Sequence, residues 1–292
     1  MLSQSVGILL PAFLMTSMLS LGLGLSVQQI VQPLRDTRLV ARSLVVSILF
    51  VPLVALAITA VIPLDPAFRV GILLFACVAG VEAGPKFVQI TGGNAAFAFG
   101  LLIFQLIVTI TFVPVFLGLL APDADIQRGP LILKLFLIIA VPVAVGGFIH
   151  GRYAKAAVRL KPIVHRMSML LLWSVFVIVM IVNFEAIRSL PANALLAGAL
   201  FFPIAFSLGY AGGGPSNQNR RALALMSFGR SGGIGIMLAG QVFAEDPGVL
   251  LVTTLMTTAS VMVAVLFVVG QRGIDALGER PEVAAHDYEV MS

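Results

Sequence analysis

Nine apolar stretches, separated by short polar segments, follow one another along the chain. They cover residues 6–27, 42–62, 69–90, 95–121, 130–150, 167–187, 192–213, 222–243 and 248–270. Each matches the roughly 20 apolar residues that an α-helix needs to cross a bilayer. No Lys or Arg precedes the first stretch, as it would in a signal peptide, so we expect a retained helix. The pattern predicts an all-α polytopic membrane protein with nine transmembrane helices.

The third and the eighth stretch are interrupted by helix-breaking residues. In the third, Gly80, Gly84 and Pro85 surround Glu82 and precede Lys86; in the eighth, four glycines lie between 229 and 235. Proline and glycine both weaken a helix, and the freed backbone groups cannot be satisfied by hydrocarbon. We therefore expect two discontinuous helices whose breaks are buried in protein or line a wet cavity.

The two breaks occupy corresponding places, because one more long apolar stretch follows each. Such a pair indicates an inverted repeat with a substrate site near the bilayer midplane. Both breaks carry charge, at Glu82 and Lys86 in the first and at Arg230 in the second, although a charge at a helix centre costs about 2.5–3.5 kcal/mol on insertion scales. The alternative is structural: glycines that serve close packing, a Glu82–Lys86 pair within one helix, and an Arg230 that snorkels.

Composition supports a lipid-facing protein. Hydrophobic residues make up 59% of the 292 positions and charged residues 11%, against about 25% charged in soluble domains. The single Cys77 and three scattered histidines offer neither a disulfide framework nor a metal site, and no cofactor is expected. The net charge of +5 does not indicate nucleic acid, because the basic residues lie between the apolar stretches.

The distribution of Lys and Arg predicts the orientation. One set of connecting segments, with the C-terminal tail, holds twelve of them and the alternate set holds three. Since cytoplasmic loops are enriched in Lys and Arg, we expect a multi-pass protein of the plasma membrane (the bacterial inner membrane) with the N-terminus outside and the C-terminus in the cytoplasm. The twelve are Arg35, Arg38, Arg42, Arg152, Lys155, Arg159, Lys161, Arg166, Arg220, Arg221, Arg272 and Arg280; the three are Arg69, Arg128 and Arg188.

Three basic residues fall within the apolar stretches: Lys86, Lys134 and Arg230. Lys134 lies near the end of its stretch, where its ammonium can reach the interface.

Several short motifs, in order along nearly the whole chain, resemble the bile acid:sodium symporter family. They are Met18–Leu25 (MLSLGLGL), Pro52, Gly92-Gly93-Asn94-Ala95, Val141-Pro142 and Gly146–His150. The resemblance implies a divergent, bacterial-type member in the nine-span form. It also implies a panel part, about 1–31 and 128–190, against which a core part, about 38–127 and 191–270, moves. Residues 271–292 would form a cytoplasmic tail.

The sodium-site motifs of that family are not kept. Gly84-Pro85 stand where the resemblance places Ser-Asn, Met226 stands for a Glu and Arg230 for a Gln. Ala98 and Leu102 replace hydroxyl residues, and Ser47 stands where the family has a Gln. Sodium requires several hard oxygen ligands, so sodium is a doubtful partner. The hypothesis is that Lys86 and Arg230 provide the positive charge instead, with coupling absent or carried by protons through Glu82.

The sequence therefore predicts a secondary transporter of small organic anions by alternating access, not an enzyme. Two alternatives stay open: an efflux carrier of the wider superfamily, of the arsenite or auxin type, and a non-transporting receptor or scaffold of the same fold. The candidate substrate- or ion-binding residues are Ser47, Glu82, Gly84, Pro85, Lys86, Ser227, Arg230 and Ser231.

Overall fold

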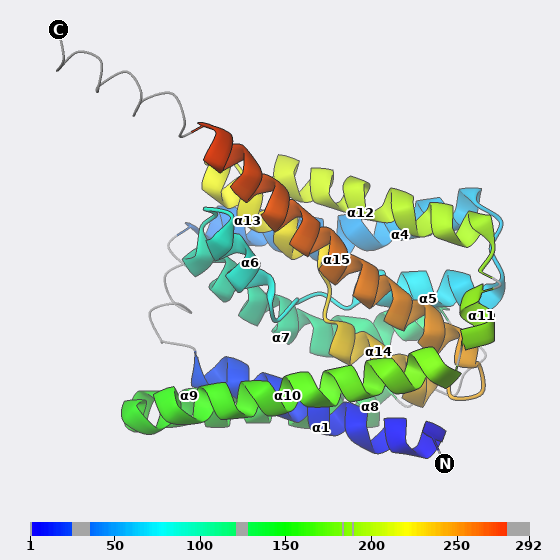
Figure 1. The fold of residues 1–292 in the computed structure, drawn as a ribbon, viewed down its shortest axis with the longest axis horizontal. Helices are drawn as coiled ribbons and strands as arrows, with labels where there is room; N and C mark the ends of the chain where they lie inside the picture. The colour runs from blue at the N-terminus through cyan, green and yellow to red at the C-terminus, as the bar shows by residue number, and fades with distance from the viewer. Residues whose placement is uncertain (1, 25–35, 121–127, 183, 189, 279–292) are drawn as a thin grey trace, which may run out of the picture.

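The structure, a computed structural model, describes residues 2–24, 36–120, 128–182, 184–188 and 190–278, and it is all-helical over these ranges. The elements are α1 (Leu2–Leu23), α3 (Thr37–Val45), η2 (Val46–Phe50), α4 (Val51–Val61), α5 (Pro66–Cys77), α6 (Gly84–Ile90), α7 (Ala95–Leu120), α8 (Arg128–Leu135), η3 (Phe136–Ala140), α9 (Val141–Arg152), α10 (Ala154–Val182), α11 (Phe184–Arg188), α12 (Ala192–Gly212), α13 (Asn217–Phe228), α14 (Gly232–Val242) and α15 (Pro247–Gly278). Figure 1 shows the helices as a bundle in which α1, α10 and α12 run along one direction and α15 crosses them obliquely.

Seven helical segments in the described part of the chain are long and apolar enough to cross a membrane. They are Thr37–Val61, Ala95–Gly118, Arg128–Arg152, Ala154–Ile178, Ala192–Gly212, Asn217–Val242 and Pro247–Gly270. The other two predicted spans, the first and the third, fall on the shorter apolar segments Ile8–Leu23 and Pro66–Cys77. The chain is therefore a multi-pass membrane protein, as its hydrophobic pattern predicts.

Two predicted boundaries differ from the observed ones by more than five residues. Residues 154–166, predicted as a basic connection, form the first turns of α10, because the Lys, Arg and Ala residues of this segment are good helix formers whatever their polarity. At the other end of the chain, α15 continues to Gly278, past the predicted limit at 270. Arg35, Arg280 and residues 279–292 of the predicted tail lie outside the described residues.

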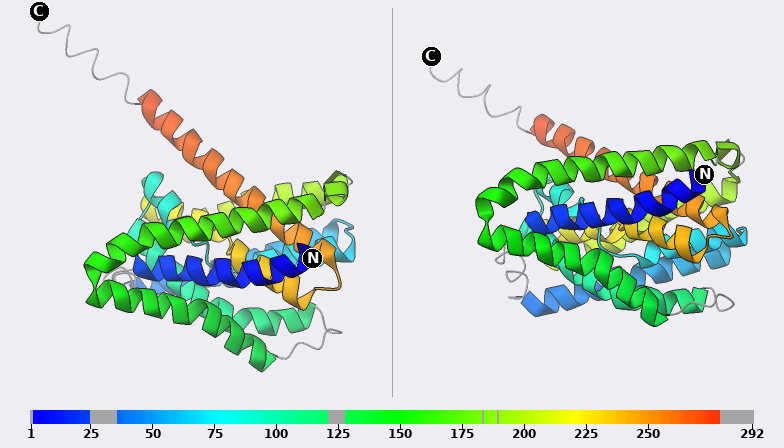
Figure 2. Two further views of the ribbon diagram at one scale, coloured as in Figure 1. Left: turned by 60° about the horizontal axis from the view of Figure 1, so that its bottom comes forward. Right: turned by 90° about the horizontal axis from the view of Figure 1, so that it is seen from below.

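The first helix packs against α9 and α10, which together occupy the lower side of the molecule in Figure 1. Figure 2 shows these three helices lying alongside one another from two further directions. Small residues allow the close approach: a Cβ on Gly146 of α9 would lie 2.6 Å from the carbonyl oxygen of Leu19. The glycines thus serve the tight packing that membrane helices use.

A second set of contacts joins the remaining helices. α12 packs on α13 and α4, α5 packs on α15 and α4, and α6 packs on α7. The interrupted segment Asn217–Val242 lies inside this set. Its 18-residue apolar stretch is entirely buried, whereas only 11% of the corresponding stretch of α10 is buried. The second discontinuous helix is thus enclosed by protein, as the sequence predicts for a broken helix.

Two helices contain a π-helical segment, η2 and η3, and each is followed closely by a proline, Pro52 and Pro142. Proline cannot donate to the preceding turn and clashes with it, and one turn of wider helix accommodates it: the amide of Val51 bonds to the carbonyl oxygen of Val46. Such segments are frequent at functional sites. Ser47, a predicted site residue, lies in η2.

Candidate functional site

The first interruption separates α5 from α6 and covers residues 78–83. Gly80 has φ +102°, a conformation that L side chains rarely adopt, so its glycine is required here. Pro85 occupies the first turn of α6, where its missing N–H leaves no intrahelical bond unmade. The carbonyl group of Ala79 accepts a bond from the Thr109 hydroxyl of α7, at 3.0 Å. The predicted interruption is confirmed, and one of its exposed backbone groups is satisfied by a neighbouring helix.

The second interruption is shorter, covering residues 229–231 between α13 and α14. Its backbone is extended, with ψ 137° at Gly229 and 91° at Ser231. The other three glycines of this stretch lie inside α14 and have a packing role. A Cβ on Gly233 would lie 2.5 Å from the ring of Phe13, and one on Gly235 would lie 3.2 Å from Thr253. For these glycines the structural alternative holds.

The two interruptions lie side by side. The amide of Ser231 donates to the carbonyl oxygen of Val78, at 3.2 Å, and the hydroxyl of Ser231 donates to Oε1 of Glu82, at 2.6 Å. A Cβ on Gly229 would lie 2.9 Å from the side chain of Val81. In Figure 1 α6 accompanies α13 on one side of this junction, and the contacts place α14 beside α5 on the other.

Extended backbone sends successive side chains to opposite sides, and Arg230 accordingly has a different partner from Ser231. Its Nη1 lies 3.5 Å from the hydroxyl oxygen of Ser47 in η2. The same hydroxyl oxygen accepts from Nε2 of Gln105, at 2.7 Å, and Nε2 also lies 3.4 Å from the carbonyl oxygen of Met226. Ser47, Gln105 and Arg230 thus form one buried polar cluster contributed by three separate helical spans.

This cluster is incompletely hydrogen-bonded. Arg230 is 1% exposed, yet its Nε and Nη2 have no hydrogen-bond partner, and no carboxylate pairs with it in the described part of the chain. Oε1 of Gln105 and the hydroxyl of Ser227 are also buried without partners. Burying a charged group without compensation costs several kcal/mol. The arrangement therefore leaves donors and acceptors available to a ligand or to water.

The predicted site residues are only partly brought together. Ser231 contacts Glu82, and Arg230 contacts Ser47. Ser227 is buried in the last turn of α13. Gly84 begins α6 and lies directly against the thioether of Met226. Lys86, in contrast, is exposed on α6, and the predicted structural pair between Glu82 and Lys86 does not form among the described residues.

Gln105 was not among the predicted site residues. It lies in the middle of the apolar stretch 95–121 and is fully buried. An amide inside a membrane helix is expensive unless it is paired, so its position alone was a usable signal. The side-chain amide of Gln105 is oriented with its NH₂ group toward Met226, because the Met226 carbonyl can only accept a hydrogen bond.

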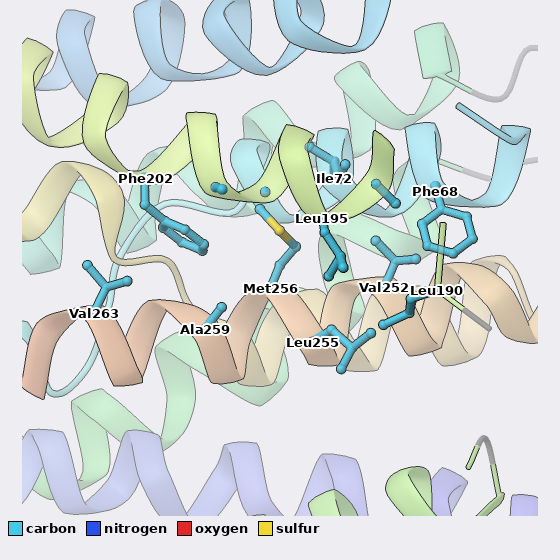
Figure 3. Close-up of a pocket in the computed structure, with 13 residues that line it drawn as sticks. Phe68, Ile72, Leu190, Leu195, Phe202, Val252, Leu255, Met256, Ala259 and Val263 are labelled. Atoms are coloured by element: carbon cyan, nitrogen blue, oxygen red, sulfur yellow. The ribbon is translucent and has the colours of Figure 1, made fainter. Parts of the chain in front are cut away.

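A cavity of about 290 Å³ lies elsewhere, between α5, α12 and α15. Figure 3 shows it lined by apolar side chains, among them Phe68, Ile72, Phe202 and Met256. None of the predicted site residues lines it. The junction of the two interruptions, with its charged and polar groups, is the stronger candidate site.

Comparison with known proteins agrees with this architecture. The profile of the Sodium Bile acid symporter family matches residues 11–190, which include Ser47, the whole first interruption and Gln105 but not Arg230. None of the curated proteins compared with the chain matches it. Because the matched residues make up more than half of the sequence, the chain belongs to the sodium bile acid symporter family.

Proposed function

We propose that this member of a transporter family is a secondary transporter of small organic anions that works by alternating access, with sodium coupling altered or absent. The observation that carries the proposal is Arg230, whose guanidinium is buried beside the junction of the two interruptions while two of its nitrogens lack a partner. A buried cation in a membrane span that is left unpaired indicates a functional site.

The chemistry of the site favours an oxyanion. A guanidinium presents its donors in a planar fork that matches carboxylate or sulfate. The N-terminus of α14 lies two residues after Arg230, at Gly232, and its positive partial charge also favours an anion. Arg230 rather than Lys86 carries this role, because Lys86 is exposed on α6.

The surroundings of Arg230 are poor in sodium ligands. Met226, which by resemblance replaces a Glu, is fully buried and apolar, and its carbonyl oxygen faces Gln105. Ala98 and Leu102, at the positions of hydroxyl residues, are buried too. Hard oxygen ligands are what sodium would need. Transport is then either facilitated or coupled to protons, with Glu82 as the group that carries the proton.

The proposed architecture has nine spans, with Ile8–Leu23 and the α5–α6 pair as the two beyond the seven long segments. The N-terminus lies outside, and two halves are related as an inverted repeat. The mutual packing of α1, α9 and α10 supports a panel part that comprises about 1–31 and 128–190. The core part, about 38–127 and 191–270, contains both interruptions and moves against the panel.

The test is uptake of a panel of radiolabelled organic anions into proteoliposomes, with and without sodium and with and without a proton gradient. We expect uptake without sodium, a loss of tenfold or more in Arg230→Gln, and partial retention in Arg230→Lys. Lys134→Gln, which removes one cation near the end of a different helix, serves as the control and transports normally.

Four results would count against the proposal or favour one of its alternatives. Uptake that requires sodium in the unaltered protein would contradict the altered coupling. Full activity of Arg230→Gln would contradict the assignment of the substrate site to Arg230. Failure to move any anion in either direction favours the receptor or scaffold alternative, whereas export of arsenite or of an auxin-type acid identifies the efflux carriers of the wider superfamily.

A further inference from the structure

We propose that the outward face of the first turns of α10 binds the phosphate headgroups of anionic phospholipids. Lys155, Arg159 and Arg166 are all exposed on this helix. At about 100° per residue, their side chains fall within an arc of roughly 40°, and they extend over about 16 Å of helix. These three residues are referred to below as the basic face.

The basic face lies on a lipid-exposed helix and not on a surface that faces only water. Large apolar side chains alternate with the cations and are strongly exposed: Val158 by 70%, Ile163 by 56% and Leu170 by 69%. Trp173, on the same side as the basic face, is 61% exposed, and tryptophan at this kind of position is typical of the membrane–water interface. Long Lys and Arg stems can lie along such a surface while their charges reach the headgroups.

No carboxylate among the described residues pairs with these cations. Residues 126–184 contain no Asp or Glu, and no ion pair involves the basic face in the described part of the chain. Lys161, on a different side of α10, is instead placed directly against Gly24, after the end of α1. The basic face is thus available to an external anion.

A phospholipid fits this face better than a second copy of the chain would. Two copies related by a twofold axis would place like charges opposite one another, which is unfavourable. A lipid headgroup brings negative charge, and its acyl chains meet the exposed Val158, Ile163 and Leu170. Clustered Lys and Arg beside a membrane span are attracted to anionic leaflets by roughly fivefold for each cation.

The experiment uses native mass spectrometry of the full-length protein in neutral detergent, titrated with phosphatidylglycerol or with phosphatidylcholine. We expect bound phosphatidylglycerol and an apparent affinity at least about tenfold lower in the variant Lys155→Gln/Arg159→Gln/Arg166→Gln. The matched control, Arg38→Gln/Arg69→Gln/Arg188→Gln, removes three exposed cations that lie on three different helices, α3, α5 and α11, and binds phosphatidylglycerol like the unaltered protein.

The thermal midpoint of the variant in detergent without phosphatidylglycerol is measured in parallel, and we expect it to equal that of the control, so that lost binding is not lost folding. The proposal is overturned if the basic-face variant binds phosphatidylglycerol as the unaltered protein does, or if the control loses as much. It is also overturned if inorganic phosphate competes as effectively as the lipid, or if the basic face proves to be covered by a second copy on cross-linking.

Discussion

Two adjacent residues of the second interruption, Arg230 and Ser231, contact different parts of the structure. Ser231 bonds through its amide and its hydroxyl to the first interruption, while Arg230 contacts Ser47 of η2. The extended backbone separates them, and a continuous helix would turn the two side chains by only about 100° relative to one another. The interruption therefore does more than bend the helix: Ser231 joins the two breaks, and Arg230 before it belongs to the buried polar cluster.

The bond between Ser231 and Glu82 can be examined with two substitutions that differ in hydrogen bonding. Glu82→Gln keeps an oxygen that accepts from the Ser231 hydroxyl, whereas Glu82→Ala leaves that buried hydroxyl without its acceptor. We expect Glu82→Ala to be destabilised by about 1–3 kcal/mol relative to Glu82→Gln, visible as a lower thermal midpoint in detergent. Equal midpoints for the two variants would show that the bond does not stabilise the junction.

The sequence singles out the charged residues of the candidate site more readily than the residues that they contact. Arg230, Glu82 and Lys86 all stand out as charges in apolar stretches, but only the fold shows that Lys86 is exposed while Arg230 is 1% exposed. Gln105 and Ser47 are 58 positions apart along the chain and meet through tertiary packing. Long-range neighbours of this kind have no signature in a single sequence.

At the scale of elements, glycine and proline predict the interruptions because their effect on a helix is local. The same local rules do not fix helix ends where polarity and helix propensity disagree. The segment 154–166 is polar enough to be interpreted as a connection, yet it is the beginning of α10. Nor does a glycine reveal whether it breaks a helix or admits a neighbour, as the contrast between Gly229 and Gly233 shows.

Gly146 and Gly147 in α9 provide a direct test of glycine as a packing residue. A Cβ on Gly146 would lie 2.6 Å from the Leu19 carbonyl oxygen and 2.7 Å from the Leu23 amide nitrogen of α1, whereas a Cβ on Gly147 would meet nothing within 4 Å. We expect Gly146→Ala to separate α1 from α9 and cost about 1–3 kcal/mol. Gly147→Ala, its matched control, should be neutral or slightly stabilising, because alanine favours the helix.

Thermal denaturation of both glycine variants in the same detergent measures the difference. A Gly146→Ala protein as stable as Gly147→Ala would mean that α1 and α9 are not in the close contact described above. The comparison does not depend on transport activity and therefore tests the fold alone.

At the scale of the whole molecule, the hydrophobic pattern accounts for the class of protein, and the structure adds how the helices are grouped. α1 packs with α9 and α10, which lie more than a hundred residues away along the chain. No local pattern in the sequence predicts this contact. The same grouping surrounds Asn217–Val242 with protein while α10 faces outward. Burial of the polar junction is thus a property of the assembled bundle, since each helix alone would expose it to lipid.

The distribution of charge over the bundle predicts its orientation, which labelling can determine. Cysteines introduced at Arg38 and Lys155 should face the cytoplasm, and cysteines at Arg69 and Arg188 should face outside, because Lys and Arg accumulate in cytoplasmic segments. All four positions are exposed, and the native Cys77 is buried and gives little background. A membrane-impermeant maleimide applied to intact cells is expected to label Arg69→Cys and Arg188→Cys only, and all four after permeabilisation. Labelling of Lys155→Cys in intact cells would reverse the orientation and place the basic face of α10 in the outer leaflet. Labelling of both Arg69→Cys and Arg38→Cys in intact cells would mean that the residues between them do not cross the membrane.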